Sequence, residues 1–70
     1  MERISEEELS DAYLAIREYA VAEDYTLLEM IMKSLGKYDF NPKDKIVIAE
    51  IKKNLSMLNY KGILLALDDR

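Results

Sequence analysis

The amino-acid sequence predicts an all-α fold, an antiparallel four-helix bundle made of two helical hairpins. Apolar residues recur at helical spacing in four stretches, and a residue type that caps helix N-termini precedes each stretch. The second half of the chain also repeats the first at an offset of 35 residues, so that Asp24-Tyr25 falls on Asn59-Tyr60. The expected helices cover residues 6–23, 25–35, 42–58 and 60–68 of a single domain, residues 1–70.

The repeat extends along the apolar faces of both hairpins. The equivalent pairs are Ile16 and Ile51, Ala20 and Leu55, Tyr25 and Tyr60, Leu28 and Ile63, and Met32 and Leu67. Tetratricopeptide arrays have a similar period, but the tryptophan-leucine-glycine pattern of that family is absent. Two copies are also fewer than the roughly three repeats that a stable solenoid needs. A closed bundle is therefore the better interpretation of the period.

The first helix has a well-marked start at Ser5. Ser5 and Glu8 form a capping box, in which each side chain accepts a hydrogen bond from the other residue's backbone N–H. Glutamates occupy residues 6–8, where negative charge complements the helix dipole. A cation site is the alternative interpretation of these glutamates, and the helix start explains them better. The expected core stripe is Leu9, Ala12, Tyr13, Ile16 and Ala20, with Tyr19 beside it.

The second helix begins after Asp24, whose carboxylate can cap the free N–H groups of the next turn. Gly36 follows the last apolar residue, and we expect it to end the helix in a left-handed conformation. Residues 37–41 are expected to form a loop in which Tyr38 and Phe40 pack against the core. The expected inner side of the helix is Leu27, Leu28, Ile31, Met32 and Leu35.

The third helix begins at Asn41-Pro42, with asparagine as the cap, and Asn59 caps the fourth. Gly62 lies inside the fourth helix, where it costs about 1 kcal/mol relative to alanine, so we expect a neighbouring helix to approach it closely. The fourth helix is apolar nearly all round and needs cover on more than one side. The expected stripe of the third helix is Ile48, Ile51, Leu55 and Leu58, with Ile46 and Val47 beside it. No stretch shows the sustained alternation of a strand.

Composition excludes several classes of function. Without cysteine or histidine, the chain has no disulfide and lacks the usual zinc and copper ligands, so we expect no cofactor. A net charge of −4 argues against nucleic-acid binding. No apolar run approaches the roughly 20 residues of a membrane span, and the N-terminus has no signal-peptide pattern, so we expect a cytoplasmic protein.

No catalytic motif is present. Nucleophilic catalysis needs a hydroxyl, thiol or amine beside a base, and no histidine exists to activate the serines or the threonine. Carboxylates could act as acid and base, but no spacing singles out a pair. The five tyrosines could line a ligand pocket, although the repeat of Tyr25 at Tyr60 favours packing. We therefore expect no enzymatic activity.

The lysines suggest a surface for a protein partner. Residues 1–35 hold nine carboxylates and three basic groups, whereas residues 36–70 hold five and seven, so the faces of the domain can differ in sign. A solvated helix surface is the simpler interpretation of these lysines. The candidate partner-binding residues are Lys45, Lys52, Lys53 and Lys61.

The chain resembles a known family in a series of short segments. These are Ile-Arg-Glu-Tyr-Ala, Asp-Tyr, Leu-Leu-Glu-Met-Ile-Met, Tyr-Asp-Phe-Asn-Pro and Leu-Asn-Tyr-Lys-Gly-Ile-Leu. Together, over about residues 8–68, they resemble a small helical module found at the C-terminal end of some bacterial hybrid sensor kinases and response regulators. That module looks like a histidine phosphotransfer (Hpt) domain without its histidine.

The resemblance implies a function without catalysis. Phosphotransfer domains carry histidine, two residues, then lysine and glycine, and here Leu58 stands where the histidine would be, before Lys61-Gly62. Phosphoryl relay through histidine is therefore impossible. The resemblance implies an interaction or regulatory module of two-component signalling that docks a partner such as a receiver or kinase domain.

Two other functions compete with this one. A structural or oligomerisation unit is favoured by apolar residues that lie off the core stripes, namely Met30, Val47 and Leu65. A small free-standing acidic adaptor or inhibitor would also fit the composition.

Overall fold

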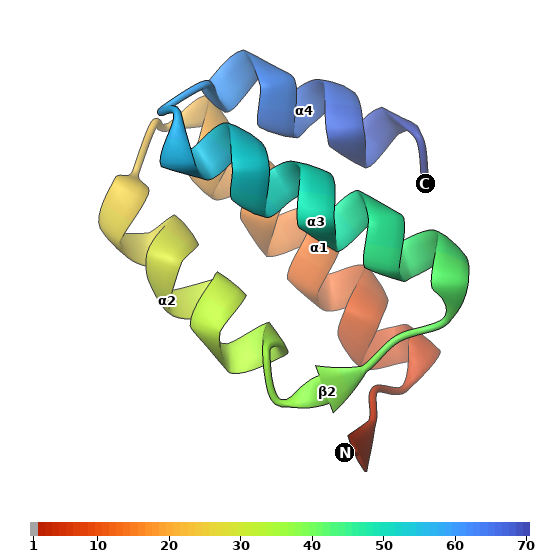
Figure 1. The fold of residues 1–70 in the computed structure, drawn as a ribbon. Helices are drawn as coiled ribbons and strands as arrows, with labels where there is room; N and C mark the ends of the chain where they lie inside the picture. The colour runs from red at the N-terminus through yellow and green to blue at the C-terminus, as the bar shows by residue number, and fades with distance from the viewer. Residues whose placement is uncertain (1) are drawn as a thin grey trace.

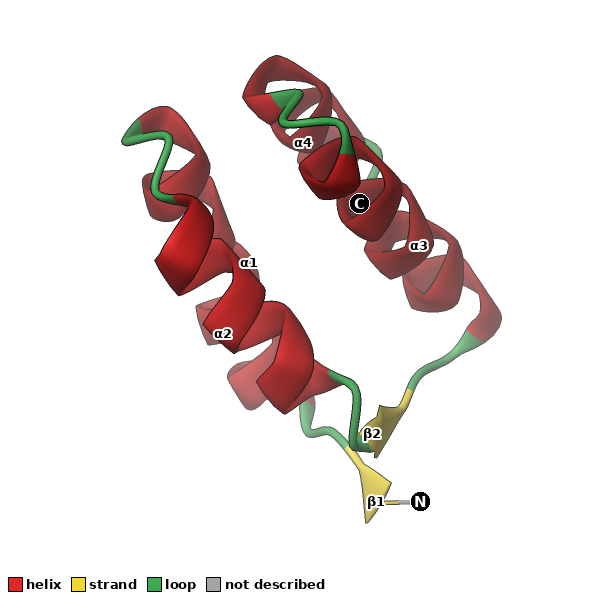
Figure 2. Ribbon diagram, turned by 60° about the vertical axis from the view of Figure 1, so that its left-hand side comes forward, coloured by secondary structure: helices red, strands yellow, loops and turns green. Residues whose placement is uncertain are grey.

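Two antiparallel helical hairpins pack against each other in the computed structural model, which describes residues 2–70 (Figures 1 and 2). The elements are β1 (Glu2–Arg3), α1 (Glu6–Val21), α2 (Tyr25–Leu35), β2 (Tyr38–Asp39), α3 (Pro42–Ser56) and α4 (Tyr60–Asp68). Each helix packs on two others, because α1 lies beside α2 and α4, and α3 lies beside α4 and α2. The predicted all-α four-helix bundle is confirmed.

The two hairpin turns have the same backbone geometry. Glu23 and Leu58, which are equivalent in the repeat, are left-handed with φ of 54° and 56°. The N–H groups of the next residues, Asp24 and Asn59, reach back to carbonyls in the preceding helix at 2.9 and 2.8 Å. α1 and α3 therefore end at Val21 and Ser56, and the expected ends at residues 23 and 58 were wrong. A left-handed residue cannot continue a right-handed helix.

Each helix starts at a residue whose side chain accepts a backbone hydrogen bond. Ser5 and Glu8 form the reciprocal capping box of α1. Asp24 accepts from the N–H of the third residue of α2 at 3.1 Å, and Asn41 and Asn59 accept in the same way at 2.8 and 3.0 Å. These bonds satisfy N–H groups that have no partner within the helix.

The link from α2 to α3 differs from the expected loop in two respects. Gly36 has φ of −62° and is right-handed, so the left-handed cap expected there was wrong. Its N–H donates to the carbonyls of Lys33 and Met32, which closes the helix without a reversal, and the chain then enters β2. β2 pairs in parallel with β1, a two-residue ladder too short to leave an alternating pattern. Tyr38 and Phe40 are half-buried against the core, as predicted.

The core is built from repeat-equivalent positions. The four largest fully buried side chains are Ile16, Leu28, Ile51 and Ile63, which form two equivalent pairs. The other buried apolar residues are Leu9, Tyr13, Ala20, Met32, Leu35, Val47, Ile48, Leu55, Ala66 and Leu67.

Some residues differ from the burial that the sequence predicted. Leu27, Ile46 and Leu58 are exposed, whereas Val47 is buried. Val47 is covered because α3 packs on two helices and buries a wide face, while Leu58 lies in the turn beyond the end of α3. Met30 and Leu65 are exposed, as predicted.

The close approach expected at Gly62 is confirmed. A Cβ atom on this residue would lie 2.6 Å from Cγ of Asn54, which projects from α3. Asn54 is held there by a 2.8 Å hydrogen bond to the carbonyl of Glu50 and accepts another from Asn59 at 3.1 Å. The glycine thus leaves room for the side chain that ties the α3–α4 turn together.

Candidate functional site

A buried polar cluster joins the start of α3 to α1. Tyr13 donates a 2.9 Å hydrogen bond to Asp44, which is only 6% exposed. The guanidinium of Arg70 lies 4.5 Å from the centre of the Tyr13 ring, and its Nε lies 3.8 Å from Asp44. Arg70 also forms an ion pair with Glu6. Burial, and then the bond to Asp44, raises the pKa of the Tyr13 phenol.

The buried part of this cluster is fully paired. Among residues 2–70, every buried side-chain nitrogen and oxygen has a hydrogen-bond partner, so Tyr13 and Asp44 present no unpaired buried group to a ligand. The sequence gives no sign of this pairing, because Tyr13 and Asp44 lie 31 positions apart and leave no local signal.

The candidate site lies between α2 and α3. We call the line along which two helices pack their seam, and the 35-residue repeat allows the two seams between the hairpins to be compared position by position. The repeat relates the α1–α4 seam to the α3–α2 seam. In the first seam, Arg17 forms a 3.2 Å ion pair with Asp68. The equivalent residues of the second seam are Lys52 and Lys33, both cations. Within the described part of the chain, no carboxylate lies within 4.0 Å of either lysine ammonium.

Two further pairs of equivalent residues differ between the seams. Ala20 of α1 corresponds to the larger Leu55 of α3, and α1 and α4 are in more extensive contact than α2 and α3. Leu64 of α4 is half-buried against the core, whereas its equivalent in α2 is the exposed Glu29. The α1–α4 seam therefore contains an ion pair and the half-buried Leu64, whereas the α2–α3 seam has two lysines and the exposed Glu29 at the equivalent positions. A hollow of about 230 Å³ lies in the α1–α4 seam, and the α2–α3 seam contains a larger one.

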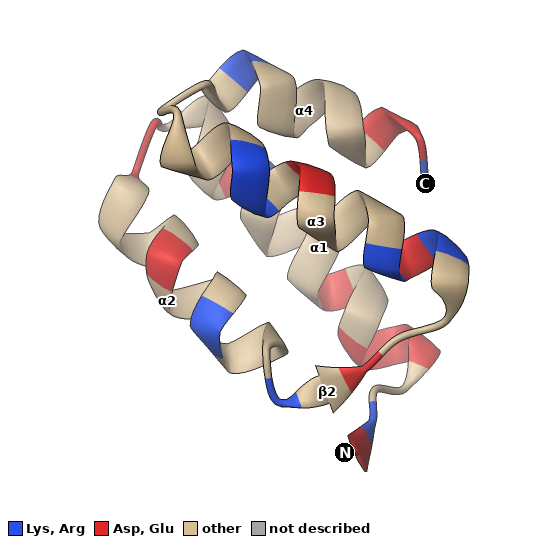
Figure 3. Cartoon of the chain, viewed as in Figure 1, with Lys and Arg blue, Asp and Glu red and all other residues tan. Residues whose placement is uncertain are grey.

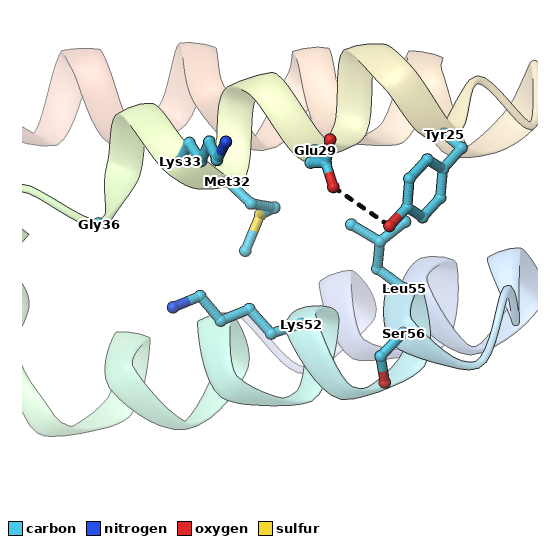
Figure 4. A pocket seen from close by; sticks show the side chains of 8 residues that line it. All are labelled: Tyr25, Glu29, Met32, Lys33, Gly36, Lys52, Leu55 and Ser56. Atoms are coloured by element: carbon cyan, nitrogen blue, oxygen red, sulfur yellow. Dashed lines mark hydrogen bonds between the residues drawn. The ribbon is translucent and has the colours of Figure 1, made fainter.

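The α2–α3 seam forms a groove, which we call the α2/α3 groove (Figure 4). Its main hollow has a volume of about 440 Å³, and a second hollow of about 220 Å³ adjoins it. The main hollow is lined by Tyr25, Glu29, Met32, Lys33, Gly36, Lys52, Leu55 and Ser56. The second is lined by Leu35, Gly36, Tyr38, Phe40, Lys45, Ile48, Ala49 and Lys52. The two share Gly36 and Lys52, so they lie next to each other along α2 and α3.

The groove has an apolar floor and a polarised rim. Met32 and Leu55, both core residues, form part of the floor. Figure 4 shows Lys33 on the α2 wall and Lys52 on the α3 wall, with Glu29 further toward Tyr25. Basic residues along α3 and α2 contrast with the acidic start of α1 (Figure 3). One end of the main hollow is thus cationic and the other carries a carboxylate.

The polar groups of the groove are engaged locally. Tyr25 donates a 3.2 Å hydrogen bond to Glu29, whose charge raises the pKa of the phenol. The hydroxyl of Ser56 donates to the carbonyl of Lys53 at 2.7 Å. A nucleophile needs a lowered pKa or a base that takes its proton. Both hydroxyls of the groove therefore donate to acceptors within the chain.

The structure brings together only part of the predicted lysine set. Lys45 and Lys52 line the groove, and Lys45 also pairs with Asp39 at 3.6 Å. Lys53 and Lys61 are exposed and line neither hollow. Sequence reasoning missed Lys33, since it lies on a different helix from the other lysines. The repeat offset was the available signal, because it aligns this lysine with Asp68.

The other candidates do not converge on one place. Tyr25 and Tyr38 line the groove, whereas Tyr13 lies in the α1–α4 seam. Residues 2–70 contain no cluster of three or more acidic side chains that could hold a metal ion. Over the same range, no helix combines the length and apolar character needed to cross a lipid bilayer.

Comparison of the chain with known protein families, curated proteins and solved structures gives no match. Function must therefore be argued from the groove, and the resemblance to phosphotransfer-like modules stays a prediction.

Proposed function

We propose that this domain is a non-catalytic protein-interaction module that docks a partner in the α2/α3 groove. One observation carries the proposal. The Arg17–Asp68 ion pair that bridges α1 and α4 has no counterpart between α3 and α2, where Lys52 and Lys33 occupy the equivalent positions. Neither lysine has an ion-pair partner among residues 2–70, so both can attract an external anion.

The composition of the groove fits a protein partner. Protein interfaces combine an apolar centre with a polar rim. Here Met32 and Leu55 supply the apolar floor, and Lys33 and Lys52 supply the rim. Nucleic acid is a poor partner, because the domain has a net charge of −4 and Glu29 lies in the groove itself.

The partner class that we propose is a receiver domain of bacterial two-component signalling. It is supported by the resemblance to phosphotransfer-like modules in residues 8–68, with Leu58 in place of the histidine. In this proposal, the chain retains the docking surface of such modules and lacks the histidine that carries the phosphoryl group.

The test is a titration of the isotope-labelled domain with receiver domains, followed by NMR. Backbone signals of the groove residues are expected to shift, with the largest changes near Lys33 and Lys52. If no receiver, phosphorylated or not, shifts any signal, the signalling partner is wrong. Shifts confined to α1 and α4 would instead show that the groove is not the docking site.

Self-association is the second candidate, and one observation favours it. Both hairpin turns lie at the same end of the bundle (Figure 1), and Val21, Met57 and Leu58 are exposed there by 57% to 69%. An apolar patch of this kind can pair with its copy in a second chain. Sedimentation equilibrium decides the matter, because a monomer at millimolar concentration removes this candidate.

A further inference from the structure

We infer that the occupant of the α2/α3 groove is an acidic amphipathic helix of the partner protein. This helix places a carboxylate between Lys33 and Lys52 and a large apolar side chain in the notch beside Gly36 and Ala49. The inference deepens the docking function proposed above and rests on it.

The carboxylate follows from the comparison of the two seams. Arg17 is neutralised by Asp68 within the chain, at 3.2 Å. Lys52 and Lys33 line the two walls of the equivalent seam, and residues 2–70 supply neither lysine with an ion-pair partner. A carboxylate from outside can supply the opposite charge that both ammonium groups lack. The partner thus supplies the anion that the other seam contains.

The apolar anchor follows from two small residues. Gly36 has no side chain, and Ala49 stands where the α1–α4 seam has Leu14. Both border the second hollow, whose lining includes the core residues Leu35 and Ile48. A leucine or phenylalanine that fills this notch removes apolar surface from water at an otherwise polar rim.

The spacing of these two features fits a helix. Lys33 precedes Gly36 by three residues on α2, and Ala49 precedes Lys52 by three residues on the antiparallel α3. The lysine level and the notch level are therefore about one helical turn apart on both walls. A partner helix lying along the groove presents a carboxylate and an apolar side chain at this separation when they are three or four residues apart.

The rim also sets the position of the partner's negative charge along the groove. Glu29 lies one turn from Lys33 on the side away from Gly36, where its charge repels a second carboxylate. The favoured helix therefore carries its negative charge over the lysines and not over Tyr25 and Glu29. Such a repulsive element contributes to specificity as much as the attractive one does.

The probe is a labelled helical peptide of about 15 residues, the length of α3, with leucines on one face and glutamates beside them. A second peptide has glutamine at every glutamate position. Binding to the full chain is measured by fluorescence anisotropy, and the bound site is mapped by NMR. We expect the glutamate peptide to bind in the groove about tenfold more tightly than the glutamine peptide, and to weaken as salt is added.

Two variants test the lysine pair. Lys33→Asp places a carboxylate beside Lys52, as Asp68 lies beside Arg17, and should reduce binding of the glutamate peptide about tenfold while the chain stays folded. Lys52→Glu is the second variant and should have the same effect from the other wall. Lys53→Asp is the matched control, because it changes the net charge as much as Lys33→Asp does and lies on the same helix as Lys52, outside the groove. It should leave binding nearly unchanged.

The outcomes separate this inference from the proposed function. Equal binding of the two peptides, or equal loss in Lys33→Asp and Lys53→Asp, would overturn the acidic-helix inference. A receiver domain that docks in the groove while neither peptide binds would also overturn it and leave the proposed function standing. Peptide binding in the groove without a response to any receiver would support the inference and remove the proposed signalling partner.

Discussion

The phenol of Tyr13 donates a 2.9 Å hydrogen bond to the carboxylate of Asp44, and this pair fastens α1 to the first turn of α3. Asp44 is nearly fully buried and its backbone N–H is bound by Asn41, so its side chain is held between a helix cap and the tyrosine. Replacing Tyr13 by phenylalanine leaves a buried carboxylate without this donor. We expect a loss of about 2 kcal/mol in the free energy of unfolding.

Urea denaturation measures this loss. Tyr25→Phe is the control, because Tyr25 is exposed and its partner Glu29 remains in water. It should cost much less, since exposed pairs contribute little. An equal loss of stability in the two variants would show that the buried Tyr13–Asp44 hydrogen bond contributes no more than the exposed Tyr25–Glu29 one.

The same pair predicts a pH dependence. Burial and the bond to Asp44 raise the pKa of Tyr13 above its ordinary value of 10.0. Below pH 10 both the folded and the unfolded chain keep the phenol proton, so the stabilisation is fully present. Above pH 10 the unfolded chain releases this proton and the folded chain retains it, so stability falls as pH rises. The difference in unfolding free energy between the wild type and Tyr13→Phe should therefore shrink between pH 9 and pH 11.5. A constant difference over that range would contradict the shift.

The two hairpin caps should contribute similar amounts. Replacing Asp24 or Asn59 by alanine removes an acceptor for a first-turn N–H and should cost about 1 kcal/mol in each case. Asn59 should be the more costly, because its amide also donates to Asn54. Thermal denaturation of the single and double variants measures the effect. Asp24→Ser and Asn59→Ser retain an acceptor and should lie near the wild type; if serine fares no better than alanine, the caps are not the cause.

Replacing either left-handed turn residue by glycine should raise the free energy of unfolding. Glu23 and Leu58 have positive φ, and neither is a glycine. Relieving this backbone conformation with glycine should raise stability by about 0.5–1 kcal/mol per site, because both side chains are exposed and little burial is lost. Met57→Gly is the control, since Met57 has φ of −96° and gains nothing from glycine. Destabilisation by Leu58→Gly in chemical denaturation would mean that the exposed leucine has a packing role.

Gly62 should resist replacement by alanine despite lying in a helix. Alanine is favoured by about 1 kcal/mol in a free helix, but here its Cβ would meet Cγ of Asn54 at 2.6 Å. Displacing Asn54 breaks its bonds to Glu50 and Asn59, so we expect a net loss of about 1–2 kcal/mol. In an Asn54→Ala background the same change should become neutral or favourable. A double-mutant cycle measures this coupling, and additive effects would argue against it.

Much of the fold could be predicted because its signals are local. A cap and the apolar stripe behind it lie within a few residues of each other, so the starts of all four helices and the ends of α2 and α4 follow from the sequence. The ends of α1 and α3 could not be placed to the residue. Their left-handed terminators, Glu23 and Leu58, are residue types that seldom adopt that conformation.

The candidate site was predicted only in part. Lys45 and Lys52 were named as binding residues on account of their helix face, and both line the groove. Lys33 was not, because its role depends on which helix packs loosely against α3.

By itself, the sequence determined the number of helices, their caps and the repeat that places Ile16 with Ile51 and Leu28 with Ile63 in the core. These features depend on periodicity and backbone hydrogen bonding over short stretches of chain. Only the tertiary structure decided that one seam is bridged by the Arg17–Asp68 ion pair while its equivalent, with Lys52 and Lys33, has no such pair. The reason is physical: whether two charges pair or repel depends on their separation in space, and residues on different helices acquire that separation only when the helices pack.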